Sequence, residues 1–206
     1  MCWISAHVHN PWHWALMWQP DQGFFHRMDI SRVVPGHAHC LGHRGEHCPH
    51  LSRLVQMIIV HTNGIHRTCL SYCECNTMEC CHQLLRSRLF PATPDDPKTV
   101  FTFNVLDEFS VHELQSRASA YSYIEGLRDL TDSSFPGDVH HPYNQFLCVT
   151  QVWNHVNVLK ESGQYQGMDA HSRLTIPGDI RVHCTACPEH GLNTTINDIG
   201  VPPEGR

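Results

Sequence analysis

Cysteine and histidine constrain this chain more than any other feature. Its 206 residues include 11 cysteines and 19 histidines, against 20 acidic and 14 basic residues. Thiolate and imidazole groups together suit Zn²⁺, which four such ligands hold tetrahedrally. An odd number of cysteines cannot pair completely into disulfides within one chain. We therefore expect cysteine pairs near histidines to be metal ligands, and isolated cysteines to be buried thiols.

The composition excludes several classes of protein. Hydrophobic residues make up 41% of the chain and charged residues 17%, which is unlike a disordered polyelectrolyte. The best apolar run, residues 54–60, has the length of a strand, whereas a membrane-spanning helix needs roughly 20 apolar residues, so no membrane partner is expected. The net charge of −6 argues against a general nucleic-acid clamp. The N-terminus lacks the features of a signal peptide, so a reducing compartment is expected.

Strand patterns come before helix patterns, which predicts an α+β fold with a small zinc-stabilised sheet. Residues 54–72 are typical of a β-hairpin, because β-branched apolar residues flank an Asn-Gly turn signal. A third strand is expected over residues 80–85. Short strands are expected around residues 12–18 and 24–25, within an irregular histidine-rich segment.

About three helices are expected after the sheet. Pro97 suits the first position of a helix, with Thr93 or Asp96 as its cap, because apolar residues then recur at helical spacing. Two further helices are predicted over residues 119–130 and 142–160, where apolar stripes indicate core or docking faces.

A central metal site is predicted where the hairpin ends. Cys73 and Cys75 form a C-x-C pair, and an extended chain places both sulfur atoms on one face. A loop that supplies His43 and Cys48 would complete four ligands, and His66 on the hairpin is a fifth candidate. The alternative is two buried thiols beside surface histidines.

Two incomplete groups lie near the ends of the chain. Cys2, His7, His9 and His13 resemble the second half of a cross-brace finger, and the alternative is a disordered histidine-rich end. Cys184 and Cys187 form a C-x-x-C pair, which is common in zinc knuckles. A redox pair is the other interpretation, but the surrounding βαβ pattern of a thioredoxin-like site is missing.

Catalytic interpretations have little support in the sequence. The nucleophile elbow, the H-E-x-x-H motif, the P-loop and the dinucleotide fingerprint are all absent, and no small-molecule substrate is evident. The rival hypothesis is a metal-dependent, nuclease-like hydrolase that uses His140, His141 and Asp138. Only their adjacency in the sequence supports it.

Several segments, in this order, resemble one known family. They are LGHRGEHCP at 41–49, TNGIH at 62–66, YCEC at 72–75, QLLRSRLFPAT at 83–93 and CTACP at 184–188. Their order is similar to the second CxC-type cysteine cluster associated with KDZ (Kyakuja–Dileera–Zisupton) transposases of basidiomycete, mushroom-forming fungi. The resemblance extends over nearly the whole chain.

The resemblance implies a zinc-chelating, non-catalytic module that lies N-terminal to a transposase domain. It points to His43, Cys48, Cys73 and Cys75 as metal ligands, with His66 as a further matching position. The family's cysteines ahead of Cys2 and its catalytic domain are not in this sequence, so we expect a fragment, a decayed copy or a stand-alone cluster protein. An inactive transposon relic with no selected function is a further alternative. DNA or transposase subunits are the expected partners, and a nuclear location follows from the resemblance alone.

The expected organisation has four parts. They are a truncated finger-like segment at 1–24, the cysteine cluster domain at 25–132, a helical extension at 133–163, and a linker with the C-x-x-C segment at 164–206. Arg86 and Arg88 beside the cluster are candidates for phosphate contacts, although isolated charges mostly lie on a solvated surface.

Overall fold

The computed structural model describes residues 11–29, 33–34, 37–42, 48–50, 54–75 and 78–161. The chain divides into two compact units, Met1–Val152 and Trp153–Arg206. In the second unit the structure describes only the end of one helix, residues 153–161. Within the described residues no helix is both long enough and apolar enough to cross a membrane.

The predicted hairpin is confirmed at the centre of the fold. Strand β4 (Val55–His61) pairs antiparallel with β5 (Gly64–Ser71), and His61 faces Gly64 across the ladder. The two-residue turn is therefore Thr62 and Asn63, and the glycine of the Asn-Gly signal is the first residue of the return strand. Its φ of +137° is a backbone conformation that residues with a side chain rarely adopt.

Gly64 offers a direct test of this turn. A Cβ at this position would lie 2.7 Å from Thr131 Oγ1 and would also meet Trp14, so Gly64→Ala should lower the free energy of unfolding by more than about 1 kcal/mol. The matched control is Gly126→Ala on an exposed helix face with open space around it, which should raise stability by roughly 0.5–1 kcal/mol. Urea unfolding of both variants gives the comparison, and equal effects would contradict the role of Gly64.

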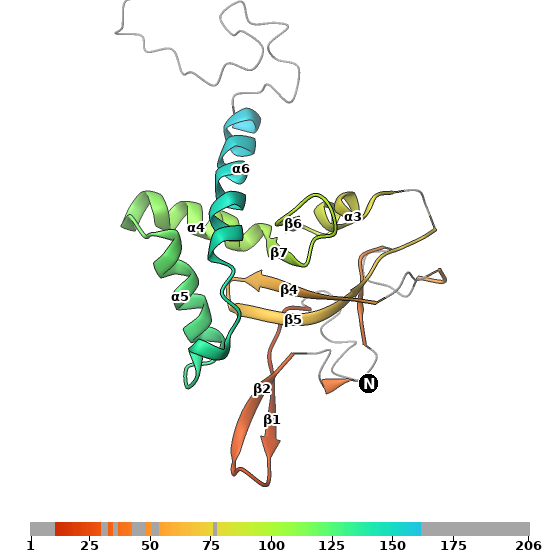
Figure 1. The fold of residues 1–206 in the computed structure, drawn as a ribbon, viewed down its shortest axis with the longest axis vertical. Coiled ribbons are helices and arrows are strands. Elements are labelled where there is room, and N and C mark those ends of the chain that lie inside the picture. The colour runs from red at the N-terminus through yellow and green to blue at the C-terminus, as the bar shows by residue number, and fades with distance from the viewer. Residues whose placement is uncertain are drawn as a thin grey trace, which may run out of the picture. The chain divides into compact units, whose positions relative to one another are not determined.

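Three further strands complete a mixed sheet in the order β3-β5-β4-β7-β6. They are β3 (His39–Cys40), β6 (Leu89–Pro91) and β7 (Thr99–Thr102). Strand β3 runs parallel to β5 and β7 runs parallel to β4, whereas β6 is antiparallel to β7. The hairpin thus occupies the middle of the sheet (Figure 1), and its apolar residues, such as Ile59 and Leu70, are fully buried.

Two predicted elements are wrong. Residues 80–85 form helix α3 (Cys80–Arg86) and not a third strand. A short apolar run does not distinguish the two by itself, and here Gln83 and Leu84 are buried side by side against the sheet. The helix expected from Pro97 also begins later, because Val100 and Phe101 lie in the buried strand β7.

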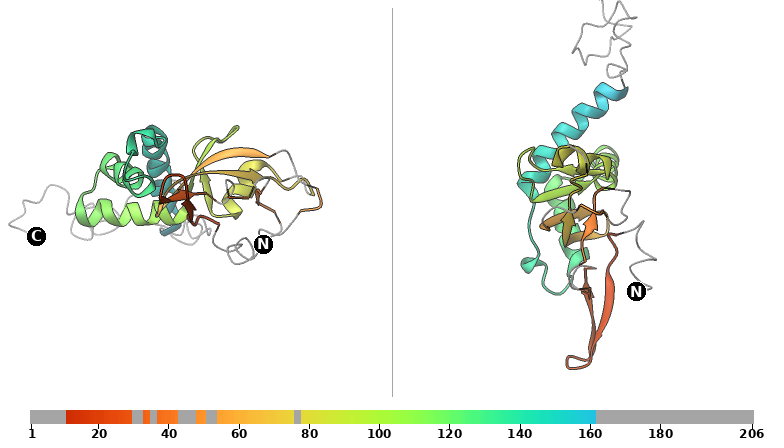
Figure 2. Two further views of the ribbon diagram at one scale, coloured as in Figure 1. Left: turned by 90° about the horizontal axis from the view of Figure 1, so that it is seen from below. Right: turned by 90° about the vertical axis from the view of Figure 1, so that its right-hand side faces the viewer.

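Helix α4 (Phe103–Ser116) therefore starts directly after β7. Its cap is Thr102, whose Oγ1 accepts a hydrogen bond from the Val105 N–H at 3.3 Å, and neither Thr93 nor Asp96 takes that role. The other two helices are confirmed as α5 (Ala120–Thr131) and α6 (Tyr143–Glu161). The fold is α+β, as predicted, and Figure 2 shows α4 and α5 grouped to one side of the sheet.

Aromatic rings join the helices to the sheet. Phe146 on α6 lies 5.4 Å from Phe101 of β7 and 4.9 Å from Phe109 of α4, measured between ring centroids. Tyr123 of α5 stacks on the same Phe146 ring at 5.8 Å. Phe101 and Phe146 are fully buried, so this cluster is the core that connects strand and helices.

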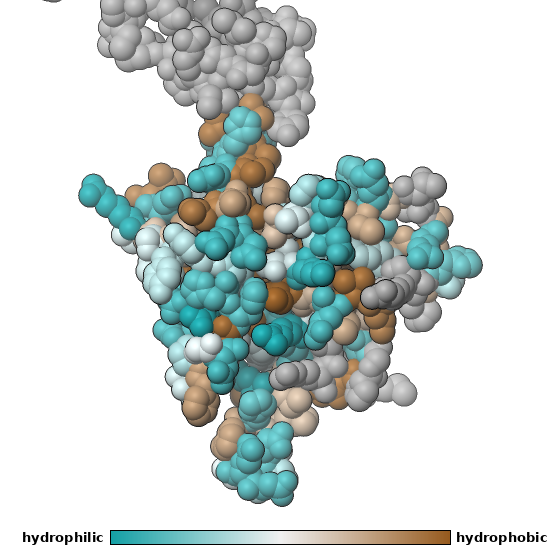
Figure 3. Space-filling view, in the orientation of Figure 1, coloured by the Kyte–Doolittle hydropathy of each residue, from teal (hydrophilic) through white to brown (hydrophobic). Residues whose placement is uncertain are grey.

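A separate two-stranded hairpin comes from the N-terminal part of the described chain. Strand β1 (Ala15–Gln19) pairs antiparallel with β2 (Phe24–Met28), which confirms the short strands expected there. Trp18 faces Phe25 across the ladder, and both side chains are more than half exposed. Figure 1 shows this hairpin projecting beyond β4 and β5. On the face drawn in Figure 3, apolar and polar residues alternate in small patches.

Candidate metal centre

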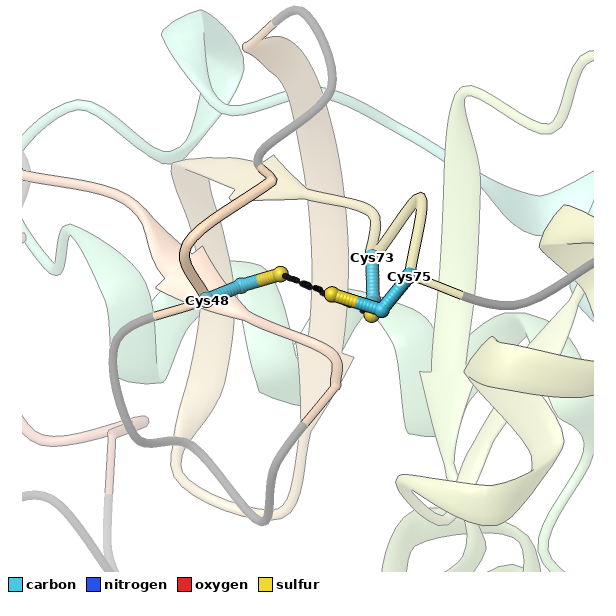
Figure 4. A group of neighbouring side chains, drawn as sticks. All are labelled: Cys48, Cys73 and Cys75. Atoms are coloured by element: carbon cyan, nitrogen blue, oxygen red, sulfur yellow. Dashed lines mark hydrogen bonds between the residues drawn. The ribbon is translucent and has the colours of Figure 1, made fainter.

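Three cysteines from two distant segments meet beside the end of β5. Cys73 and Cys75 follow the strand, and Cys48 comes from the loop before β4 (Figure 4). The Cys48 sulfur lies 3.5 Å from that of Cys73 and 3.4 Å from that of Cys75. All three sulfur atoms lie within 4.8 Å of one another. Sulfur atoms around a tetrahedral zinc ion lie about 3.8 Å apart, given Zn–S bonds of about 2.3 Å, so the spacing fits a shared metal ion.

The group is buried on one side and open on the other. Cys48 is 1% exposed and Cys73 is 6% exposed, whereas Cys75 is exposed. Burial, together with the neighbouring Cys75, raises the pKa of the Cys48 thiol to about 11. Without a metal ion Cys48 therefore keeps its proton at neutral pH, and a bound cation would have to displace that proton.

Gln83 of α3 fixes the backbone of the C-x-C pair. The Cys73 N–H donates to Gln83 Oε1 at 2.8 Å, and Gln83 Nε2 donates to the Cys73 carbonyl at 3.0 Å. The same amide donates to the Met78 carbonyl at 2.9 Å. This buried side chain satisfies both backbone groups of Cys73, so it positions the sulfur without touching it.

Gly42 brings the preceding loop against the same strand end. A Cβ on Gly42 would lie 2.4 Å from Cys73 Cβ and 3.0 Å from its sulfur, so only glycine fits there. The adjacent Leu41 N–H donates to the Ser71 carbonyl at 3.0 Å, which continues the pairing of β3 with β5. Neither Gly42 nor Gln83 was among the site residues predicted from the sequence. A glycine directly before a candidate ligand was the one signal available for Gly42.

Most of the other predicted ligands lie outside the described residues. They are His43, Cys2, His7, Cys184 and Cys187. His13 is described and exposed, and it is not part of the cysteine group.

His66 is buried on β5 and is also not part of the cysteine group. Its Nδ1 lies 2.8 Å from Asp29 Oδ1, and its Nε2 lies 2.8 Å from Asn63 Oδ1. The ring stacks on Trp14 with the centroids 4.1 Å apart. Both ring nitrogens thus have partners within the protein.

The residues of the rival hydrolase hypothesis, His140, His141 and Asp138, each have separate neighbours. His141 Nε2 lies 2.8 Å from Glu125 Oε1, a carboxylate that also accepts a hydrogen bond from Arg128. His140 Nε2 is buried and has no hydrogen-bond partner among the described residues. Asp138 ends a short 3₁₀ turn, Pro136–Asp138. Across the described part of the chain, the three cysteines are the one group of three or more side chains arranged to hold a metal ion.

Fold and site together define a small α+β domain with a clustered set of cysteine thiols at the end of its central hairpin. Residues 35–134 match the family model described as CxC2 like cysteine cluster associated with KDZ transposases. This part of the chain is therefore a CxC2-like cysteine cluster domain, and the resemblance found in the sequence is confirmed over residues 35–134. Such a domain is an accessory cysteine cluster and not a catalytic one. No curated protein and no solved structure matches the chain.

Proposed function

We propose that this chain is a zinc-binding, non-catalytic accessory module of a KDZ-type transposase. The observation that carries the proposal is the group of three thiols within 4.8 Å of one another, inside a domain associated with these transposases. Soft thiolate ligands favour Zn²⁺ over the hard cations Mg²⁺ and Ca²⁺. Four ligands close a structural zinc site, so one more donor is needed.

His43 is our choice for the fourth ligand. It follows Gly42, whose backbone lies against Cys73, and the same loop ends at Cys48 within the cysteine group. The described residues on either side of this segment, Gly42 and Cys48, thus both lie at the cysteine group. The matched comparison is His50, which also lies beside Cys48. The backbone carbonyl of His50 accepts a hydrogen bond from the Cys48 thiol at 3.1 Å. His43→Ala should weaken zinc binding, and His50→Ala should not.

In this proposal zinc stabilises the fold, and the function of the module is to contact a partner. The net charge of −6 disfavours a strong nonspecific grip on phosphate, which requires several Lys or Arg contacts. Arg88 lies 5.9 Å above the Phe103 ring and Arg86 is exposed, so both remain candidates for a local DNA contact. Contact with a transposase subunit is at least equally well supported, and either partner places the module in the nucleus.

A salt titration of DNA binding separates the two kinds of partner. If DNA is the partner, the affinity of zinc-loaded protein for duplex DNA should fall steeply as salt rises, and Arg86→Ala with Arg88→Ala should flatten that slope. Each single arginine variant is compared with Lys160→Ala on α6, which removes one positive charge from a different element. An affinity that does not depend on salt, or no affinity at all, would reject the DNA version and leave the protein–protein version. Absence of tightly bound metal from the purified protein would reject the zinc proposal.

We further propose that the functional domain spans residues 25–132 and that the helical extension spans residues 133–163. The groups of Cys2 with His7 and His13, and of Cys184 with Cys187, would be partial zinc sites on either side of it. Metal content per chain distinguishes one central ion from additional ones.

A further inference from the structure

A cavity of about 410 Å³ lies between the β1–β2 hairpin and the end of α5. Its size falls in the range of ligand pockets, roughly 300–1,000 Å³. Four consecutive residues of β2, 24–27, line it, whereas β1 contributes Leu16 alone. Successive side chains of a strand point to opposite faces, so four in a row border a cavity only where the edge of the strand faces it. Figure 1 accordingly shows β2 as the strand of the hairpin nearer to α5.

The edge of β2 beside the cavity has no partner strand in the part of the chain that the structure describes, where β2 pairs with β1 alone. An unpaired edge presents backbone N–H and C=O groups on which another strand can add. A two-stranded hairpin is also only marginally stable by itself. Strand addition is an established way to bind a peptide, because backbone hydrogen bonds give affinity and alternate side chains give specificity.

The wall of the cavity that the hairpin provides is apolar and exposed. Leu16 is 63% exposed and Phe25 is 62% exposed, and the register of the hairpin places both on the same face. Trp14 lines the base of the same wall, where its Nε1 donates to the Asn63 carbonyl at 3.1 Å. Neighbouring exposed apolar side chains of this kind mark contact sites for other proteins.

The charges around the cavity favour a basic partner. Arg27 donates from its guanidinium group to the Leu130 carbonyl in the last turn of α5, where the helix dipole favours a cation. The net charge of −6 on the whole chain adds a long-range attraction for positive charge. Carboxylates outnumber guanidinium groups in the lining, which has Asp29, Asp132 and Asp138 against Arg27 and Arg67.

We propose that this cavity binds an extended, basic segment of a partner protein, which adds to the free edge of β2 as a third strand. The inference rests on the proposed accessory role, in which the partner is a transposase subunit. Apolar side chains of the segment would pack on Leu16 and Phe25, and Lys or Arg side chains would lie near Asp132 and Asp138. None of the three clustered thiols lines the cavity, so the binding site and the metal site are separate.

Short peptides of random sequence, displayed on phage and selected on zinc-loaded full-length protein, are the probe. Selected peptides should alternate apolar residues with Lys or Arg. Leu16→Glu places a charge on the apolar wall and should weaken their binding by about tenfold or more. Met17→Glu is the matched control, because Met17 is also exposed but points to the other face of β1, so binding should not change.

A second pair of variants tests the charges. Asp138 is exposed and lines the cavity, so Asp138→Asn should weaken binding of the selected peptides by roughly two- to fivefold. Asp129→Asn removes the same charge from an exposed position on α5 that does not line the cavity, and it should leave binding unchanged. Equal effects of the two substitutions would contradict recognition of a basic segment by this cavity.

Strand addition itself is tested with the unmodified protein, whether or not the variants fold. One selected peptide is made in two versions, with its backbone nitrogens methylated at alternate positions, either odd or even. Only one edge of an added strand pairs with β2, so one version should lose binding and the other should keep it. Two versions that bind equally would overturn the proposal.

The remaining outcomes are distinct. Selection of no peptide whose binding depends on Leu16 would overturn the proposal. If Leu16→Glu weakened binding of duplex DNA and left peptide binding unchanged, the surface would be a DNA contact, and the proposal would again be wrong. Zinc content is measured in every protein. Protein that binds the peptides without zinc would refute the metal proposal alone, and zinc-loaded protein that does not bind them would refute this inference alone.

Discussion

Changing both Cys73 and Cys75 to serine should abolish tight zinc binding and unfold the domain around the central hairpin. Structural zinc contributes roughly 10 kcal/mol or more to folding in small zinc domains, which is comparable with the whole stability of a protein of this size. Serine hydroxyls do not replace two thiolates, one of which belongs to the buried Cys73. Elemental analysis and thermal unfolding of the purified variant measure the two effects.

Cys148→Ser is the matched control for this experiment. Cys148 lies exposed on α6 and is not part of the cysteine group, so its replacement should leave zinc content and melting temperature unchanged. Equal stability of the unmodified protein and the double variant would refute a structural metal. The three thiols, two of them buried, would then be ordinary side chains at the end of the hairpin.

Phe146→Ala should be the most damaging substitution in the aromatic core. Phe146 is fully buried and contacts Phe101, Phe109 and Tyr123, which come from three different elements. Truncating a buried phenylalanine typically costs about 3–5 kcal/mol, because the cavity relaxes only partly. The measurement is the free energy of unfolding from urea titration, made with zinc present throughout.

The neighbouring residue provides the comparison. Leu147 is the next residue on α6 and is 39% exposed, so Leu147→Ala should cost well under half as much. Loss of the Phe146 ring should leave zinc content unchanged, since the thiols lie at the end of β5. Similar costs for the two substitutions would show that the Phe146 cluster is not a cooperative part of the core.

The hairpin and its cysteines were predictable because their signals are local. β-Branched residues on both sides of Asn63 and Gly64 predict the strands, and the C-x-C spacing predicts how Cys73 and Cys75 project. Cys48 was added to this pair only because a zinc site needs four ligands. The structure places its sulfur beside those of Cys73 and Cys75. Helices α5 and α6 were predicted for the same reason, since amphipathic periodicity is a property of the segment itself.

The errors arose where distant contacts decide the structure. Val100 and Phe101 form a strand because they pair in parallel with β4. The sequence of residues 97–109 alone does not predict that pairing. Gln83 is buried in a helix because the Cys73 backbone needs its amide. The partners of His66 illustrate the same limit, since Asp29 is far from it in the sequence.

The parallel pairings have a consequence for the order in which the chain folds. Strands β4 and β5 are joined by a two-residue turn and can form early, because closing so short a loop costs little entropy. Strand β7 pairs with β4 only after the whole segment containing α3 and β6 has been brought back, and β3 must reach β5 across the loop that carries Cys48. Such long-range pairings are slow to form. Folding in the presence of zinc should therefore be fastest at the hairpin and should finish at the two parallel pairs, β4 with β7 and β3 with β5.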